Sequence, residues 1–435
     1  MIGFGADNMS IIEAALQSSK DYFEERYHSS VEQNRKGDFA VTVLKNGKPY
    51  HSEVSYRLDR IDYELGCNIF MIDQYTDPEQ QRLYLENWKR LFNVAVVPLY
   101  WEGTEPSEGY LRYDCNVPND VYRRPSVDRV VSYCQENNIP MKGHPLFWHE
   151  FIPRWLPEDW DTLLPLIEKR FREISERYGD KIQAFDCVNE PSRIWDMGYE
   201  HATDGYKMIT PPEGYIEQVF TLGKKYFPNN DLILNEATGA SICEFRGVYG
   251  AYYQLLEKLL AKGLKIDRIG LQCHVKDAPV FKNAFDSARL YGILDGYGKF
   301  GKPIVISEIG LNCEDEQLQA QAAERLYKTC FSHGSTSGIF WWNLDDNSIL
   351  TMQKRKAGAE NLPYGGLCRN GIPKPAYQVL DRLINEEWKT VGSGCADGGV
   401  LRFRGFYGNY ILTIDGKEYP VKLNKNDDHN IKIEV

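Results

Sequence analysis

Residues 184–190 read Ala-Phe-Asp-Cys-Val-Asn-Glu, and residues 303–308 read Pro-Ile-Val-Ile-Ser-Glu. Each is a short apolar run that ends in polar residues. Such runs are typical of strands of a parallel sheet that is buried on both faces. The pattern occurs eight times, at residues 67–72, 94–100, 139–148, 184–189, 232–235, 268–274, 303–308 and 338–342.

Helical patterns separate these runs. They cover residues 79–91, 127–135, 163–178, 215–226, 248–262 and 316–330, and a last one covers residues 376–387 after the eighth run. Eight strand–helix units in about 320 residues favour a closed parallel barrel over an open sheet. The predicted fold class is therefore α/β, a (β/α)8 TIM barrel.

Both ends of the chain depart from this alternation. Residues 9–36 show the apolar stripe of a helix that Ser10 can cap, and residues 39–44 and 51–58 resemble a strand pair joined by an Asn-Gly turn. After the linker-like Gly392-Ser393-Gly394, short strands are expected at residues 400–403, 410–414, 418–421 and 431–435. The predicted divisions are an N-terminal helix and small β element (1–65), a barrel (66–391) and a small C-terminal β module (392–435).

Composition excludes several classes of partner. The net charge of -11 and pI of about 5.4 disfavour nucleic acid and anionic membranes, which reward clustered basic residues. There is no run of roughly 18 to 20 apolar residues for a membrane helix. Residues 1–8 show no secretory signal, so we expect a cytoplasmic protein, or a secreted or periplasmic one if a signal precedes this sequence. We expect reduced cysteines, no metal and no cofactor; the oligomeric state stays open.

Polar residues cluster at the predicted strand ends, where a TIM barrel places its active site. Glu190 ends the fourth strand and Glu308 the seventh, so they lie across the barrel mouth from each other. Two facing carboxyl groups suit glycosidic bond cleavage: one protonates the leaving group, and the other attacks the anomeric carbon. A separation of about 5 to 5.5 Å gives retention of configuration, and a larger one gives inversion.

At these residues the chain resembles glycoside hydrolase family 10, best known for endo-β-1,4-xylanases. The resemblance spans about residues 66–385 and rests on several motifs in family order. They are Trp-Glu-Gly-Thr-Glu-Pro (101–106), Gly-His-Pro-Leu-Phe-Trp-His (143–149), Asp-Cys-Val-Asn-Glu (186–190), Ile-Gly-Leu-Gln-Cys-His (269–274), Ile-Ser-Glu-Ile (306–309) and Lys-Pro-Ala-Tyr (374–377). Together they are far more specific than any one alone.

The resemblance implies a role for each matching residue. Glu190 would be the general acid and then the base, and Glu308 the nucleophile of a double displacement. Supporting contacts to the sugar or to Glu308 would come from Asn189, Gln272, His274, His144, Trp148 and Trp341, the last as the floor of the sugar site. The implied substrate is xylan, or a xylan-derived or related β-linked plant or algal polysaccharide or oligosaccharide.

The departures from the family lie together on the glycone-binding side. Residues 96–101 read Val-Val-Pro-Leu-Tyr-Trp where the family has a polar segment, and Phe151 stands where the family has Gln. Losing hydrogen-bond partners for sugar hydroxyls weakens recognition strongly. The sugar therefore differs from xylose, or other side chains such as Tyr100 bind it, or the enzyme is slow or specialised for short or decorated chains.

Two other classes of function stay open on the sequence alone. A metal-dependent sugar isomerase could use Glu190, Glu236, His274 and Glu308 as ligands, and its activity would respond to a chelator. A non-catalytic carbohydrate-binding protein derived from the family would retain polysaccharide without cleaving it.

Overall fold

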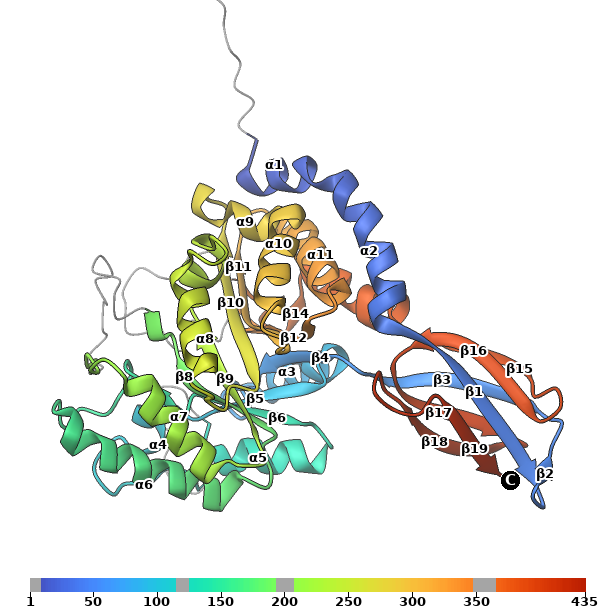
Figure 1. The fold of residues 1–435 in the computed structure, drawn as a ribbon, viewed down its shortest axis with the longest axis horizontal. Coiled ribbons are helices and arrows are strands. Elements are labelled where there is room, and N and C mark those ends of the chain that lie inside the picture. The colour runs from blue at the N-terminus through green and yellow to red at the C-terminus, as the bar shows by residue number, and fades with distance from the viewer. Residues whose placement is uncertain (1–8, 115–124, 193–206, 347–364) are drawn as a thin grey trace, which may run out of the picture.

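The computed structural model describes residues 9–114, 125–192, 207–346 and 365–435, and its centre is a closed parallel barrel (Figure 1). The barrel strands are β4 (Glu64–Asn68), β5 (Val94–Pro98), β6 (Met141–His144) with β7 (Phe147–Trp148), β8 (Ala184–Asn189), β9 (Asp231–Glu236), β10 (Arg268–Lys276), β11 (Ile304–Asn312) and β12 (Thr336–Trp341). Each pairs in parallel with its neighbour, β12 pairs with β4, and β6 and β7 both pair with β8. The predicted (β/α)8 barrel is confirmed.

Helices surround the strands, and all but the one at residues 287–298 lie at nearly the predicted positions. They are α3 (Pro78–Leu91), α5 (Val127–Glu136), α6 (Trp160–Tyr178), α7 (Tyr215–Tyr226), α8 (Ala251–Ala261), α10 (Ser287–Gly298), α11 (Glu316–Ser332) and α13 (Pro375–Arg382). Among the strands, the first differs most from the prediction: it covers Glu64–Asn68 and not residues 67–72. Residues 69–72 are buried after the strand has ended, in a turn closed by the Ile72 N–H and the Ile69 carbonyl.

Strands from the two ends of the chain share two further sheets beside the barrel (Figure 1). In one sheet, β1 (Lys36–Lys45) pairs with β16 (Val400–Phe406), β19 (Asn430–Glu434) and the short β2 (Lys48–Pro49). In the other, β3 (Glu53–Ile61) pairs with β15 (Val391–Cys395) and β17 (Gly408–Ile414), and β17 continues to β18 (Lys417–Leu423). The predicted division at residues 65 and 391 stays a prediction. In the structure, strands from the two flanks hydrogen-bond to each other.

Two local predictions about these flanks are wrong. The runs at 39–44 and 51–58 do not pair with each other, because β1 and β3 belong to different sheets. Gly392-Ser393-Gly394 is not a linker but the middle of β15, in register with β3. A Cβ atom at Gly392 would lie 2.5 Å from the Tyr56 hydroxyl, so glycine serves close packing here and not mobility.

The N-terminal helical segment joins the two parts of the molecule. It forms α1 (Ile11–Ser18), which Ser10 caps as predicted, and α2 (Lys20–Arg35), which leads directly into β1. At its end the buried Arg35 guanidinium donates to the carbonyls of His333 (2.6 Å) and Thr336 (2.8 Å), beside the start of β12. These hydrogen bonds from a buried guanidinium to barrel carbonyls anchor α2 to the barrel.

Two further sequence expectations concern cysteines and membranes. The nine cysteines in the described ranges are all free thiols, and seven of them are buried. Over the same residues, every helix is too short or too polar to cross a lipid bilayer.

Candidate active site

Gln272 on β10 brings the two predicted catalytic carboxyl groups together. Its side-chain Nε2 lies 2.9 Å from Glu190 Oε1 and 3.2 Å from Glu308 Oε1. Because both contacts start from one nitrogen, the two Oε1 atoms are at most about 6 Å apart, the sum of these distances. This limit lies below the roughly 6.5 to 9.5 Å that an inverting pair needs to admit a water molecule.

Asn235, at the end of β9, aligns a second pair of site residues. Its Nδ2 donates to Asn189 Oδ1 (2.8 Å) and to Glu308 Oε1 (3.0 Å), and its own Oδ1 accepts from Ser307 Oγ (2.5 Å). The amide of Asn189 is thereby held beside the Glu308 carboxylate.

Glu308 is buried, with 4% of its surface exposed, yet its surroundings favour the ionised form. Burial raises the pKa of this carboxyl, but His144, His274 and Lys142 lower it, and the pKa lies below its ordinary value. His274 Nε2 is 3.1 Å from Oε2, and His144 Nδ1 is 3.8 Å from Oε1. A carboxylate kept ionised inside an apolar barrel is suited to nucleophilic attack.

A buried ion pair lies beneath this carboxylate. Lys142 Nζ donates to Asp186 Oδ2 (2.7 Å), and His144 Nδ1 is 2.6 Å from the same oxygen. All three residues are 2% exposed or less. Burial raises the pKa of Asp186, but Lys142 and His144 lower it below its ordinary value, so the group stays ionised. Asp186 therefore orients the His144 ring, which also contacts the Trp342 ring.

The backbone at Glu190 is held in an unusual conformation. Its φ is 50°, a region that residues other than glycine rarely adopt, and its N–H donates to the Asn235 carbonyl (2.7 Å). The fully buried Glu236 carboxyl accepts from the backbone N–H of Ser192 (3.2 Å) and Ala237 (2.7 Å). The end of β9 thus secures the turn that carries Glu190, as expected for strain stored at a functional site.

The surroundings of the Glu236 carboxyl favour its protonated form, in contrast to those of Asp186. Burial, together with the charge of Glu190, raises its pKa from 4.5 to about 8, although hydrogen bonds from Ser192 and Ala237 oppose the shift. Metal ligands of this type bind as carboxylates. A bound cation would itself lower this pKa, so the isomerase hypothesis is tested by the response of activity to a chelator.

We expect Glu236→Gln to flatten the dependence of stability on pH. A carboxyl whose pKa is raised on folding keeps its proton in the native state and loses it in the unfolded state. The wild-type free energy of unfolding should therefore fall as pH rises from 4.5 towards about 8, and this contribution should vanish in the variant. Urea titrations of both proteins at several pH values measure it; parallel curves would contradict the raised pKa.

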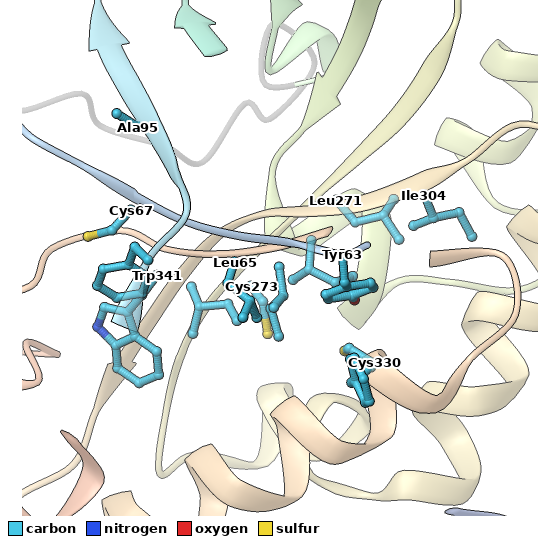
Figure 2. Close-up of a cluster of buried hydrophobic side chains, with 14 of the residues drawn as sticks. Tyr63, Leu65, Cys67, Ala95, Leu271, Cys273, Ile304, Cys330 and Trp341 are labelled. Atoms are coloured by element: carbon cyan, nitrogen blue, oxygen red, sulfur yellow. The ribbon is translucent and has the colours of Figure 1, made fainter. Parts of the chain in front are cut away.

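The prediction that Trp341 floors the sugar site is wrong. Its side chain is fully buried in the barrel core, where Figure 2 labels it, and its Nε1 donates to the Gly365 carbonyl (2.9 Å). The next residue, Trp342, faces the site: its ring centroid lies 5.0 Å from that of His144 and 6.3 Å from that of His274. Successive residues at a strand end point to opposite sides, so one position decides which ring is available.

Aromatic rings lie together where the family resemblance implies a polar segment. Tyr100 lies edge-on to His144, with centroids 5.3 Å apart, and it also neighbours Trp148 (6.2 Å) and Phe151 (6.4 Å). Trp148 and Phe151 stack at 4.8 Å. The predicted residues Tyr100, His144 and Trp148 therefore lie together, and they are continuous with Trp342 through His144.

Two tryptophan substitutions should separate these roles. We expect Trp341→Ala to lower the free energy of unfolding by about 3 to 5 kcal/mol, the usual cost of a large cavity. Trp342→Ala should instead lower kcat/KM by roughly tenfold to a hundredfold, which corresponds to losing about 1.4 to 2.8 kcal/mol of transition-state contact. Chemical denaturation and kinetics on both variants test this. If Trp341→Ala lost activity and Trp342→Ala lost stability instead, Trp341 would be restored as the floor of the sugar site.

Ile349, which stands where the resemblance implies a second tryptophan after the eighth strand, is one of residues 347–364, which lie outside the described residues. Among those described, sequence reasoning missed Lys142, Asp186 and Asn235 as supports of the site. Lys142 and Asp186 did carry a signal, since a charged residue within a doubly buried strand needs a partner.

The chain matches one family model and is similar to several known proteins. Residues 79–382 match the model of "Glycosyl hydrolase family 10". The chain is 29% identical over 360 residues to the anti-sigma-I factor RsgI6 of Acetivibrio thermocellus, covering 79% of this chain and 41% of that protein. It is 27% identical over 293 residues to endo-1,4-beta-xylanase B of Cellvibrio japonicus, covering 66% of this chain and 43% of that protein.

Among solved structures, xylanase 10B from Thermotoga petrophila RKU-1, in complex with xylobiose, matches with a TM-score of 0.56. It is 22% identical, and the match covers 75% of this chain and 95% of that one. This likeness supports the barrel fold. This chain spans less than half the length of both sequence relatives, which therefore contain further segments.

Proposed function

Because the chain belongs to glycosyl hydrolase family 10, we propose that it is a retaining β-glycoside hydrolase with Glu190 as acid/base and Glu308 as nucleophile. The observation that carries the proposal is the shared contact of Gln272 Nε2 with both carboxyl groups, 2.9 and 3.2 Å away. Their separation fits attack on the anomeric carbon from one side while the leaving group departs on the other.

In the first step the Glu308 carboxylate attacks the anomeric carbon as Glu190 gives its proton to the departing glycosidic oxygen. The glycosidic C–O bond breaks and an ester to Glu308 forms. In the second step Glu190 takes a proton from water, whose oxygen attacks the same carbon and releases Glu308. Two inversions give net retention, and a water molecule is consumed. Asn189 is placed to bind a hydroxyl beside the reacting carbon.

We propose xylan or a xylan-derived or related β-linked oligosaccharide as the substrate class. The apolar wall formed by Tyr100, Trp148 and Phe151 favours stacking on a sugar face over hydrogen bonding to hydroxyls. Such a wall tolerates sugars that lack a hydroxyl or carry an acyl or methyl substituent. Short or decorated chains therefore belong in any search for the substrate.

The test is product release from a panel of β-linked polysaccharides and oligosaccharides, including acetylated xylans, with Glu308→Gln run beside the wild type. Cleavage of xylan or its fragments, lost in the variant, supports the whole proposal. Cleavage of another β-glycan, also lost, keeps the mechanism and reassigns the sugar. Polysaccharide retention without cleavage would favour a binding protein and overturn the enzymatic proposal.

A further inference from the structure

A thiol, an imidazole and a carboxylate meet on the surface of the β sheets, far from the barrel mouth. His51 Nε2 lies 3.4 Å from Cys395 Sγ, and His51 Nδ1 lies 3.5 Å from Asp397 Oδ1. One ligand atom from each residue can be chosen so that all three lie within 4.8 Å of one another. His51 and Cys395 are 344 residues apart in the chain, so no local sequence motif could have indicated the cluster.

The backbone beneath the cluster is fixed. His51 precedes β3 and Cys395 ends β15, which pairs with β3 in antiparallel register. Ala396 is fully buried, and its N–H donates to the Ser52 carbonyl (2.8 Å). Cys395 and Asp397 flank this buried residue, and His51 flanks Ser52, so their three side chains stand on the outer side of one hydrogen-bonded pair.

A fourth side chain lies on the same face. Glu53 is directly opposite Cys395 in the β3–β15 ladder, and both residues are exposed. Opposite residues of an antiparallel pair have Cβ atoms about 4.5 to 5.5 Å apart, within reach of one shared ion. The local charge is therefore negative, and it favours a cation.

We propose that His51, Cys395 and Asp397 form a site for a divalent zinc-type cation that clips the start of β3 to the end of β15. Zinc accepts thiolate, imidazole and carboxylate ligands at about 2.0 to 2.3 Å, so ligand atoms around a tetrahedral ion are roughly 3.4 to 3.8 Å apart. With one ligand atom from each residue, the three lie within 4.8 Å of one another, so small side-chain rotations bring them to that spacing. On binding, the Cys395 thiol releases its proton to solvent, and Glu53 or water completes the coordination.

This site is separate from the proposed catalytic function and serves the β sheets. The two strands that it joins come from opposite ends of the chain. A cation that binds only the folded form raises stability by mass action, so zinc should make the pairing of β3 with β15 more resistant to unfolding.

The test follows alkylation of Cys395 by iodoacetamide, with and without ZnCl2, by peptide mass spectrometry. Only a free thiolate reacts, so zinc should slow alkylation of Cys395 by roughly tenfold or more, and a chelator should reverse the effect. Cys243, which is partly exposed, provides an internal control whose rate should not change. The full-length chain is used throughout.

Matched variants identify the ligands. His51→Ala and Asp397→Asn should each lose most of the protection by zinc, whereas His28→Ala, which alters another exposed histidine, should keep it. CoCl2 should give a thiolate-to-cobalt charge-transfer band that is absent in Cys395→Ser. Unchanged alkylation with zinc, or equal protection in His51→Ala, would overturn the proposal. All the substituted residues are exposed, and circular dichroism verifies that each variant protein folds.

Discussion

Glu308→Gln should reduce kcat on any cleaved β-glycan by on the order of 10⁴- to 10⁶-fold, the loss typical of removing a nucleophile from its catalytic set. The amide has the size of the carboxylate and keeps an oxygen for His274, so the barrel should fold normally. It cannot form the ester to the sugar. Kinetics with purified protein measure the loss, and Glu314→Gln, an exposed substitution six residues away, serves as the matched control.

Trapping of the covalent intermediate makes this prediction specific for retention. A 2-deoxy-2-fluoro β-glycoside with a good leaving group destabilises the oxocarbenium-like transition state and slows breakdown of the glycosyl-enzyme. Wild-type protein should gain the mass of one fluorosugar on the peptide that contains Glu308, and Glu308→Gln should gain none. A label on Glu190, or rapid cleavage without any label in a protein that is otherwise active, would contradict the proposed roles.

The barrel was predictable because its strands are buried on both faces and its helices on one. These two burial patterns give apolar runs and helical periodicity that can be read locally, as in residues 184–189. The first strand was misplaced because β4 begins at Glu64, whose carboxylate pairs with Arg268 (2.7 Å) across the end of the barrel. A polar strand start that is stabilised by a distant partner gives no local signal.

The flanking sheets could not be derived in the same way. Individual strands such as β17 and β18, with their Asp415-Gly416 turn, were predictable because the hairpin is local. The pairings of β1 with β16 and of β3 with β15 join opposite ends of the chain. Short alternating strands specify which face is buried but not which strand lies beside them.

The two proposed catalytic carboxyl groups were predictable from strand-end polarity, whereas the tryptophan ring that lies beside them was not. Trp341 and Trp342 are adjacent and chemically identical. A shift of one residue along the strand would place Trp342 in the core and Trp341 beside the carboxyl groups. Only the contacts of each ring, with Gly365 for Trp341 and with His144 for Trp342, separate them. The supports of Glu308 depend likewise on three strands, β6, β9 and β10, meeting at one point.

Glu190→Ala should have an effect that depends on the leaving group. A general acid contributes about 10² to 10⁴-fold when the leaving oxygen needs a proton. Cleavage of β-linked oligosaccharides should fall by that factor. A 2,4-dinitrophenyl β-glycoside needs little protonation, so its bond should still break, and the glycosyl-enzyme should accumulate because Glu190 no longer activates water.

Azide provides the complementary measurement. It needs no general base and is small enough to enter the space left by Glu190→Ala, so it should restore turnover of the dinitrophenyl glycoside. The product should be the β-glycosyl azide, because azide attacks an α-linked ester on Glu308 from the opposite face. Glu236→Gln, altered at the neighbouring carboxyl, should show no azide dependence. An α-glycosyl azide would indicate direct displacement, and the assignment of Glu308 as nucleophile would then fall with that of Glu190.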